Sequence, residues 1–542
     1  MKKMTILTGI LFSAALVVTV SGCKGDKLSA IQVDPYTLAA NYRNLRIKGI
    51  GYSGEQFTEH SEMREVDGKQ VMKSTYVIED VKALVVPVDF TDYPYTDYAN
   101  SEEEMNAELT KVFFGDEDDM EWYSLAGYYK STSFGKCNIS GSVAPVWHTN
   151  QKVSQINKDE TGYAANLAVQ IQDYYRSHSE INLAEYDANQ DGFIDSLIMI
   201  YTAPITTTGE LWWAFCSSVS GAFGKYTKTG NLEGAHRFFW ASYRFLYERW
   251  NRQSGEAEQY TSSEIKAGVD IHGNPIHPDA HTMTHEYGHV LSLPDYYITD
   301  YAASDYGAMG GLDMMDYNVG DHNAYSKMMY GWINPRRIAG TKGKITLTLN
   351  STTTTGDTII IPAPGKWNDT YLDQYLVVEF LTPEGVAKQD GTERYLGHYP
   401  LYYNKAGIRI LHIDSRMGVY TYTGTGDTGS YKFTGYTWNT TPPDSTKTYV
   451  KVAADNTASR SCFSKYKLAE VLPSDGKSIK AHNSKATTDC LYFEGQSFGV
   501  AGGAWADFKL NGISGEKDEE FGFKITIDKI DGNKSATITI SR

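Results

Sequence analysis

The features that this 542-residue sequence lacks already narrow its class. Beyond residue 20 it has no apolar run long enough to cross a bilayer, so we expect no membrane-spanning domain. It has no excess of positive charge: 50 Lys and Arg stand against 66 Asp and Glu, and this net charge of −16 repels phosphate backbones. Nucleic acid is therefore not an expected partner. The sequence also has no internal repeat, which argues against a solenoid.

Cysteine is scarce, with five in the whole chain, and the first of them follows an apparent export signal. Lys2 and Lys3 precede an apolar run over 4–20 that suits the hydrophobic region of a signal peptide. The run ends in Val-Ser-Gly-Cys, which resembles the bacterial lipobox, so Cys23 is predicted to carry a diacylglycerol. The alternative is a plain signal peptide with a chance cysteine. The remaining cysteines form an even set whose spacing defines no pairing: Cys137, Cys216, Cys462 and Cys490.

Hydrophobic periodicity divides the rest of the chain. An apolar run over 81–90 predicts the first buried strand of a domain, and apolar residues at helical spacing predict a helix over 102–114. From residue 343 onward helix signals fade, and alternation over 344–349 predicts strands. The expected parts are a lipoprotein signal peptide over 1–23, a polar linker or pro-region over 24–80, a domain over 81–340 and a β-rich region over 341–542. Whether the segment 24–80 inhibits an enzyme or acts as a spacer stays open.

The main chemical motif is His-Glu-Tyr-Gly-His at 285–289. Positions four apart share one face of a helix, so His285 and His289 can bind one metal ion while Glu286 holds a water molecule. Pro278 and Asp279 lie near a plausible helix start, and Pro294 is expected to end the helix. The alternative is a surface helix with two unrelated histidines.

Zinc enzymes with two histidines on one helix differ in the residue that supplies the third protein ligand of the metal. One class takes a glutamate from a later helix, but the sequence has no glutamate between Glu286 and Glu379, which argues against that class. The metzincins take a histidine or an aspartate ten residues after the first histidine, and that position is Asp295, whose carboxylate is an ordinary zinc ligand. Ser292 departs from the metzincin pattern, which has glycine there. The rival ligands are other aspartates: Asp305, Asp313, Asp316 and Asp321.

Met-Met-Asp-Tyr at 314–317 follows at a distance that suits the methionine turn beneath the zinc in metzincins. Met315 is the better-placed methionine. Tyr317 lies two residues further on, where some metzincins carry a tyrosine that reaches the metal or the developing oxyanion, and a phenol is a good hydrogen-bond donor to such an oxyanion. For both residues the alternative is ordinary core packing.

A second metal-like pattern lies over 187–195. Side-chain oxygens at the first, third, fifth and ninth positions, with a carbonyl at the seventh, reproduce the start of an EF-hand calcium loop. These predicted ligands are Asp187, Asn189, Asp191, Asp195 and the carbonyl of Phe193. The final glutamate is missing because Ile198 occupies its position, so we expect the loop to lead into a buried strand. The alternative is a simple turn before that strand.

Several segments together resemble the immune inhibitor A family of secreted bacterial metallopeptidases. They are 285–297 around the HEYGH motif, 310–315, 324–327, 330–333, 128–136 and 407–414. The resemblance implies a secreted zinc endopeptidase with structural calcium. It also implies an α+β fold, in which a zincin- or metzincin-like catalytic domain with a mixed β-sheet and an active-site helix precedes a β-sandwich-like C-terminal region.

The residues and the resemblance together predict a metalloendopeptidase that cleaves protein or peptide substrates, with Glu286 moving the proton. The rival is a catalytically silent surface adhesin, or a glycan- or protein-binding lipoprotein on a zincin fold, which is expected to have lost its glutamate or a ligand. The β-rich region has aromatic residues that suit either a core or a binding platform: Tyr402, Tyr403, Trp438 and Trp505. The expected location is the bacterial cell envelope, as an outer-membrane lipoprotein facing the periplasm or the cell surface. Its membrane contact is expected through the N-terminal lipid only.

Overall fold

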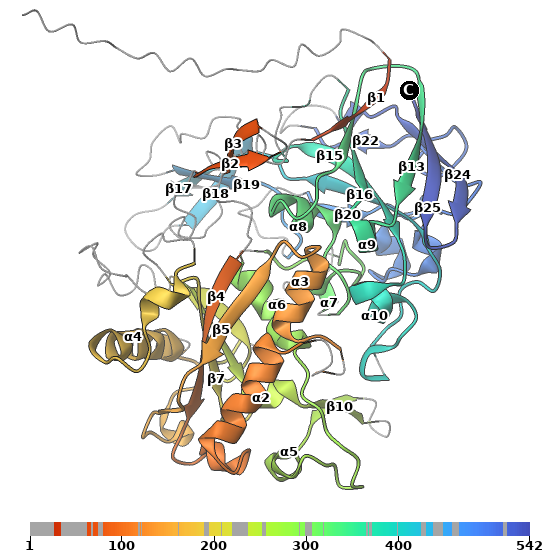
Figure 1. Ribbon diagram of the computed structural model, residues 1–542. Helices are drawn as coiled ribbons and strands as arrows, with labels where there is room; N and C mark the ends of the chain where they lie inside the picture. The colour runs from red at the N-terminus through yellow and green to blue at the C-terminus, as the bar shows by residue number, and fades with distance from the viewer. Residues whose placement is uncertain are drawn as a thin grey trace, which may run out of the picture.

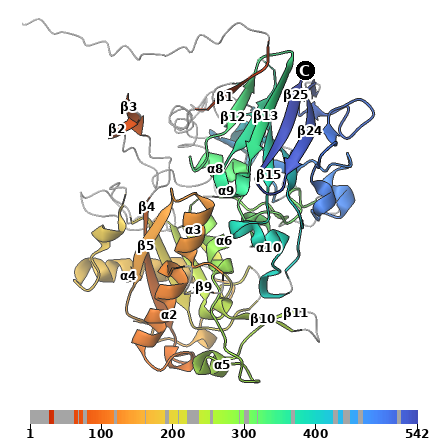
Figure 2. The same cartoon turned by 45° about the vertical axis from the view of Figure 1, so that its right-hand side comes forward.

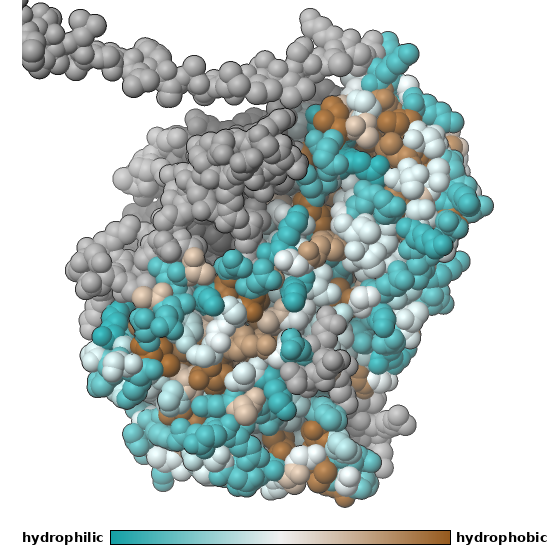
Figure 3. Space-filling view, in the orientation of Figure 1, coloured by the Kyte–Doolittle hydropathy of each residue, from teal (hydrophilic) through white to brown (hydrophobic). Residues whose placement is uncertain are grey.

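The computed structural model shows a helix-containing half, drawn in orange to green, and a β-rich half, drawn mainly in green to blue and joined by the red strand β1 (Figure 1). It describes residues 27–33, 62–66, 69–73, 80–116, 120, 122–160, 162–188, 194–206, 209–218, 237–251, 256–291, 293–298, 306–317, 319–364, 367, 371–397, 399–423, 430–436, 448–457, 466–512 and 518–542. None of the helices within these ranges combines the length and the apolar character needed to span a bilayer. Hydrophilic residues cover most of the placed surface on the face seen in Figure 3.

A mixed sheet forms the centre of the helix-containing half. Its strand order is β5-β4-β7-β9-β8, and β6 also pairs with β4. The strands are β4 (Asp80–Asp89), β5 (Asn138–Val143), β6 (Trp147–His148), β7 (Ser196–Tyr201), β8 (Phe215–Ser218) and β9 (Arg237–Ser242). All these pairs are parallel except β8 with β9, which is antiparallel. Every residue of β7 is buried, as expected for a parallel strand covered on both faces.

Helices cover both faces of this sheet and give three layers (Figures 1 and 2). Ala83 and Val85 of β4 pack into the cluster that contains residues of α2 (Glu102–Phe114), α3 (Leu125–Thr132) and α6 (His281–Val290). The alternate residues Leu84 and Val86 pack with α4 (Gly162–Ser177) on the other face. This alternation follows from the two-residue period of a strand. The half also contains β10 (Glu248–Asn251), β11 (Glu256–Gln259), α5 (Ser262–Ala267), α7 (Met314–Tyr317) and α8 (Ala324–Met329).

The β-rich half is built on two sheets. A six-stranded sheet has the order β1-β12-β14-β15-β16-β20, and a four-stranded sheet has the order β13-β25-β24-β21. Their bounds are β1 (Ser29–Gln32), β12 (Arg336–Ala339), β13 (Lys344–Asn350), β14 (Thr358–Pro362), β15 (Gln374–Leu381), β16 (Gly407–Asp414), β20 (Ala469–Val471), β21 (Ser497–Phe498), β24 (Lys524–Asp531) and β25 (Ser535–Ser541). Residues of both sheets, such as Ile361 and Ile538, share one apolar core.

Smaller elements complete this half of the molecule. They are the pair of β22 (Lys509–Leu510) with β23 (Glu519–Glu520), the sheet of β17 (Met417–Thr423), β18 (Ser430–Tyr436) and β19 (Thr448–Val452), and the helices α9 (Thr352–Thr355) and α10 (Lys388–Gly391). A separate pair, β2 (Glu62–Val66) with β3 (Lys69–Lys73), precedes β4 in the chain. The C-terminal region is therefore rich in strands without being purely β.

The structure confirms the predicted α+β class. The strand expected over 81–90 is β4, the helix over 102–114 is α2 and the strand over 344–349 is β13. The segment 24–80 is not a simple linker: β2 and β3 within it pair with each other, and β1 pairs with β12 as an edge strand of the six-stranded sheet. The boundaries of the predicted parts stay predictions.

Candidate active site

Helix α6 carries the HEYGH motif and lies under the sheet. It begins at His281, whose backbone N–H is accepted by the Asp279 carboxylate at 2.9 Å, and it ends at Val290, before Pro294. Tyr287 is buried, and its hydroxyl lies 3.1 Å from Ser196 Oγ of β7. The hydroxyl of Tyr129 in α3 donates to the Thr284 carbonyl at 2.8 Å. These contacts fix the rotation of α6 against the sheet and against α3.

The two histidines of the motif are oriented by backbone carbonyls. The Nδ1–H of His285 donates to the Met314 carbonyl at 2.9 Å, and the Nδ1–H of His289 donates to the Leu293 carbonyl at 2.9 Å. Because a carbonyl only accepts, both rings carry their proton on Nδ1. Nε2 is therefore the nitrogen of each ring that can bind a metal ion once it has lost its proton, which is the second-sphere arrangement common in metal sites.

Asp295 completes a three-residue cluster with these histidines. Its Oδ1 lies 3.3 Å from His285 Nε2 and 3.1 Å from His289 Nε2. The three possible ligand atoms all lie within 4.8 Å of one another. Asp295 Oδ1 is buried, and within the described part of the chain no hydrogen-bond partner is found for it other than these two Nε2 atoms. A buried carboxylate is costly unless positive charge compensates it, so the donor set fits a divalent cation.

Charges within this cluster shift its pKa values. Burial lowers the pKa of His289, but the Asp295 carboxylate and Glu286 outweigh burial and raise this pKa to about 9. Burial raises the pKa of Asp295, but the two histidines outweigh it and hold this pKa well below the usual range. Without a metal ion the cluster is therefore an ion pair, in which a proton occupies the position of the cation.

The rival aspartates are engaged elsewhere. Asp313 accepts the backbone N–H groups of Met315 and Asn323 at 2.8 and 2.7 Å. Asp316 accepts from the backbone N–H of Gly311 at 2.7 Å. Asp321 accepts from Lys327 Nζ at 2.6 Å. Asp305 and Ser292 lie outside the described residues. Of the aspartates that the structure describes, Asp295 is the one that it brings to the two histidines.

Glu286 lies beside the cluster and is buried. Burial raises its pKa, and the positive charges of His289 and His285 offset part of this rise. A hydrogen bond from the backbone of Cys216, in strand β8, also stabilises the carboxylate. Sequence reasoning missed this contact because a backbone amide donates it, so no side-chain pattern could reveal it. The edge of the sheet thereby orients the group that the motif assigns to proton transfer.

Met315 packs against α6, where a Cβ atom on Gly288 would lie 2.4 Å from its Sδ, while its role in a methionine turn stays a prediction. It is fully buried, and its carbonyl accepts from the backbone N–H of Tyr296, next to Asp295, at 2.8 Å. The ring of Tyr297 lies 6.1 Å from that of His285 between centroids. Met315 therefore contacts both α6 and the segment that carries Asp295, the third candidate ligand.

Tyr317 is 48% exposed at the end of α7 and packs against residues of the C-terminal region. Its ring centroid lies 5.7 Å from that of Tyr399 and 6.4 Å from that of Tyr402. The proposed role of Tyr317 in binding an oxyanion stays a prediction. Sequence reasoning assigned Tyr402 only to a core or a platform, and it did not single out Tyr399.

A buried polar cluster at the start of α6 was also missed. His281 Nδ1 lies 2.6 Å from an Asp279 carboxylate oxygen, and His281 Nε2 lies 2.9 Å from the hydroxyl of Tyr399. The hydroxyl of Tyr395 donates to the other Asp279 oxygen. The available signal was His281 itself, one helical turn before His285. Asp279 is only two residues away, but the two tyrosines lie more than a hundred residues further along the chain, so spacing could not identify them.

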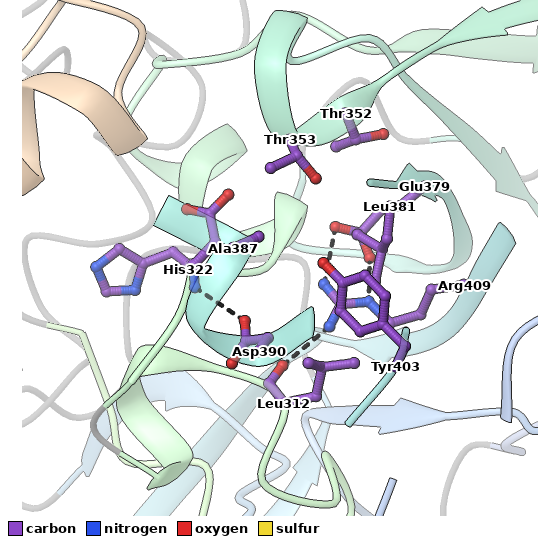
Figure 4. A pocket seen from close by; sticks show the side chains of 11 residues that line it. Leu312, His322, Thr352, Thr353, Glu379, Leu381, Ala387, Asp390, Tyr403 and Arg409 are labelled. Atoms are coloured by element: carbon purple, nitrogen blue, oxygen red, sulfur yellow. Dashed lines mark hydrogen bonds and ion pairs between the residues drawn. The ribbon is translucent and has the colours of Figure 1, made fainter. Parts of the chain in front are cut away.

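The C-terminal sheet supports the methionine turn through a small polar pocket (Figure 4). Arg409 of β16 forms a two-point ion pair with Glu379 of β15, at 2.7 and 3.0 Å, and its third nitrogen donates to the Leu312 carbonyl at 2.9 Å. Asp390 of α10 accepts from the backbone N–H of Asp321 at 3.3 Å. Burial raises the pKa of Asp390 well above its usual range. The loops on both sides of α7 are thus held by the β-rich half.

The predicted calcium loop is described only at its two ends. Asn189, Asp191 and Phe193 lie outside the described residues, as does the predicted lipidation site Cys23. The Oδ2 atom of Asp195 accepts from the backbone N–H groups of Lys82 and Ala188 at 2.7 and 3.2 Å. The loop leads into β7, so the expected strand is confirmed, while calcium binding stays a prediction.

Comparisons with known proteins point to one class. No known family's sequence profile matches the chain. The chain is similar to the pre-pro-metalloprotease PrtV of two Vibrio cholerae serotype O1 strains, with 24% identity over 254 residues. The match covers 41% of this chain and 26% of PrtV, so the chain spans about a quarter of the length of these relatives. This distant similarity supports a relationship to bacterial metalloproteases, without showing membership of the immune inhibitor A family.

Proposed function

We propose that this protein is a zinc endopeptidase that hydrolyses peptide bonds of protein substrates. The observation that carries the proposal is the convergence of His285 Nε2, His289 Nε2 and Asp295 Oδ1 within 4.8 Å. The similarity to a metalloprotease supports the same reaction class.

His285, His289 and Asp295 would hold the metal. A bound Zn²⁺ supplies a Lewis acid that polarises a carbonyl and makes a water molecule more acidic. The Met314 and Leu293 carbonyls keep both imidazoles in the tautomer that can bind it. Because ligands must be deprotonated, His289 would hold the metal only after losing the proton on Nε2.

Glu286 acts as the proton carrier. Burial raises the pKa of this carboxylate, so it is a stronger base than a surface glutamate. It takes a proton from the attacking water at its carboxylate oxygens and gives this proton to the departing amine nitrogen. The Cys216 amide holds the carboxylate in place during both transfers. Tyr317 donates its hydroxyl proton in a hydrogen bond to the oxygen of the attacked carbonyl.

Two further assignments belong to the proposal. Asp187, Asn189, Asp191, Phe193 and Asp195 bind a structural Ca²⁺ before strand β7. The chain is exported and held in the bacterial cell envelope by a lipid on Cys23.

The alternative is a surface-binding protein that no longer cleaves. The three candidate ligands and Glu286 are all present and lie together, which favours the enzyme. The deciding experiment is metal analysis of the purified protein together with casein cleavage, with and without a chelator. We expect about one zinc per chain and cleavage that the chelator abolishes and zinc restores. A zinc-loaded protein that leaves casein and a peptide library intact would favour the binding protein.

A further inference from the structure

The chain enters the folded body at the β-rich end, directly after the predicted lipid site. Lys27 forms a β-bridge with Lys342, and the backbone N–H of Leu28 donates to the Lys342 carbonyl at 3.1 Å. Strand β1 then pairs with β12 in the six-stranded sheet, with Ser29 opposite Ala339. Three residues separate Cys23 from Lys27, so their Cα atoms are four residue steps apart and at most about 14 Å from each other. A lipid on Cys23 therefore holds this end of the body close to a membrane.

The same end of the molecule carries a group of exposed lysines. Lys344 of β13 and Lys524 of β24 both lie in register with Ser541 of β25. Gly343, between Lys342 and Lys344, exchanges two backbone hydrogen bonds with Arg542 at 2.8 and 3.0 Å. The strand ends therefore meet at one edge of the four-stranded sheet. We call the exposed residues Lys27, Lys342, Lys344 and Lys524 the lysine edge.

The sign of this charge is opposite to that of the whole protein. The whole chain has a formal net charge of −16, so a group of four lysines at one end differs in sign from the average charge of the protein. The side chain of Arg542 donates to the Phe521 carbonyl at 3.3 Å, which brings the segment after β23 to this end. This segment follows Glu519 and Glu520 of β23, and Glu520 lies in register with the basic residue Lys509 of β22. The lysine edge therefore suits an anionic surface.

The catalytic half lies at the other end of the molecule. Both views place β1 and the C-terminus at one end, while α2 and α5 lie at the opposite end (Figures 1 and 2). Hydrophilic residues also cover the tip of the end near β1 (Figure 3). A membrane that contacts the lysine edge would therefore lie away from the catalytic half.

We propose that the lysine edge docks on anionic phospholipid headgroups when Cys23 is lipidated, so that the catalytic half points away from the membrane. The lipid and the lysine edge act together, since one lipid group and a basic patch stabilise attachment more than either alone. Each exposed lysine near an anionic surface contributes about fivefold to its binding. The consequence is an enzyme that faces proteins outside the membrane. This inference rests on the proposed lipid anchor and is independent of the proposed peptidase activity.

The test measures the depth of two labels on the lipidated full chain. A fluorophore is attached to Thr341→Cys, beside the lysine edge, or to Ile271→Cys, which is 75% exposed in the catalytic half. The chain is placed in phosphatidylcholine vesicles with phosphatidylglycerol and a headgroup quencher. The unsubstituted chain, labelled in parallel, gives the background from native cysteines. We expect several-fold stronger quenching at position 341 than at position 271.

A charge variant separates docking from simple tethering. Lys342→Glu with Lys344→Glu should reduce the quenching at position 341, as should pure phosphatidylcholine vesicles. The matched control reverses two exposed lysines of the catalytic half, Lys111→Glu with Lys152→Glu, and should leave the quenching unchanged. Equal quenching at the two label positions on a lipidated chain would overturn the docking. A mass spectrum without lipid on Cys23 would overturn the anchor and the docking together, while casein cleavage would still report the peptidase separately.

Discussion

Gly288 of α6 lies directly against Met315 of α7: a Cβ atom on Gly288 would be 2.4 Å from Met315 Sδ and 3.3 Å from the hydroxyl of Tyr129. The two residues between Glu286 and His289 in the HEYGH motif therefore have different roles. Tyr287 anchors the helix to β7, while Gly288 admits the methionine that lies beneath the histidines. A glycine inside a helix costs about 0.5–1 kcal/mol relative to alanine, so this close approach explains its presence.

Gly288→Ala should destabilise the protein by about 1–3 kcal/mol, because the added methyl group overpacks the contact with Met315. The matched control is Gly162→Ala in α4, where a Cβ atom has no neighbour within 4 Å. Urea unfolding measures both variants. A Gly288→Ala protein as stable as the control would contradict the packing described for Met315.

Glu286→Gln should retain zinc, because the three candidate ligands remain, and should lose about 10²–10⁴-fold in peptide cleavage. The readouts are kcat/KM on a casein-derived peptide and zinc content per chain. The control is Glu160→Gln, which changes an exposed carboxylate in the same half of the molecule. Near-normal cleavage by Glu286→Gln would remove this residue from the mechanism.

Asp295→Ala should weaken zinc binding strongly, since it removes the only carboxylate that the described residues bring to the histidines. Asp316→Asn should keep zinc, because the amide oxygen can still accept from Gly311. Competition with a fluorescent zinc chelator gives both affinities. The reverse ranking would make Asp316 the third ligand.

Zinc binding should release a proton below pH 9. The pKa of His289 is raised from 6.5 to about 9 in the metal-free protein, so its imidazolium stabilises the fold fully below pH 6.5 and loses this contribution as the pH rises through 9. Zinc must displace that proton, so zinc affinity should rise about tenfold per pH unit up to pH 9. Calorimetry at pH 7.5 in buffers of different ionisation enthalpy counts the protons. Asp295→Asn should release fewer protons, and a heat independent of the buffer would contradict the ion pair.

Asp187→Asn combined with Asp191→Asn should reduce the increase in Tm that added calcium produces. Calcium binds only the folded loop and stabilises it by mass action. Thermal unfolding with calcium and with a calcium chelator measures the response, and Asp159→Asn serves as the surface control. An unchanged calcium response would favour the alternative that this loop is a simple turn before β7 and binds no calcium.

Local patterns in the sequence were sufficient to predict several helices and strands of the fold. The apolar spacing over 102–114 predicted α2, and Ser101 accepts from the Glu104 amide at its start, as a helix cap does. Alternation over 344–349 predicted β13. Such predictions succeed because the period of a helix or a strand is set by neighbouring residues. The strand β1 could not be predicted in the same way, because its partner β12 lies about three hundred residues further along the chain.

The sequence by itself determined that His285, Glu286 and His289 share one helical turn, since that depends only on helix geometry. It limited the third candidate metal ligand to a few aspartates. Only the tertiary structure decided between those that it describes: hydrogen bonds from Met315, Gly311 and Lys327 occupy the rivals, and Asp295 faces the two imidazoles. It also placed the Cys216 amide on Glu286. The physical reason is that these contacts join residues far apart in the chain, and the packing of the whole molecule selects them.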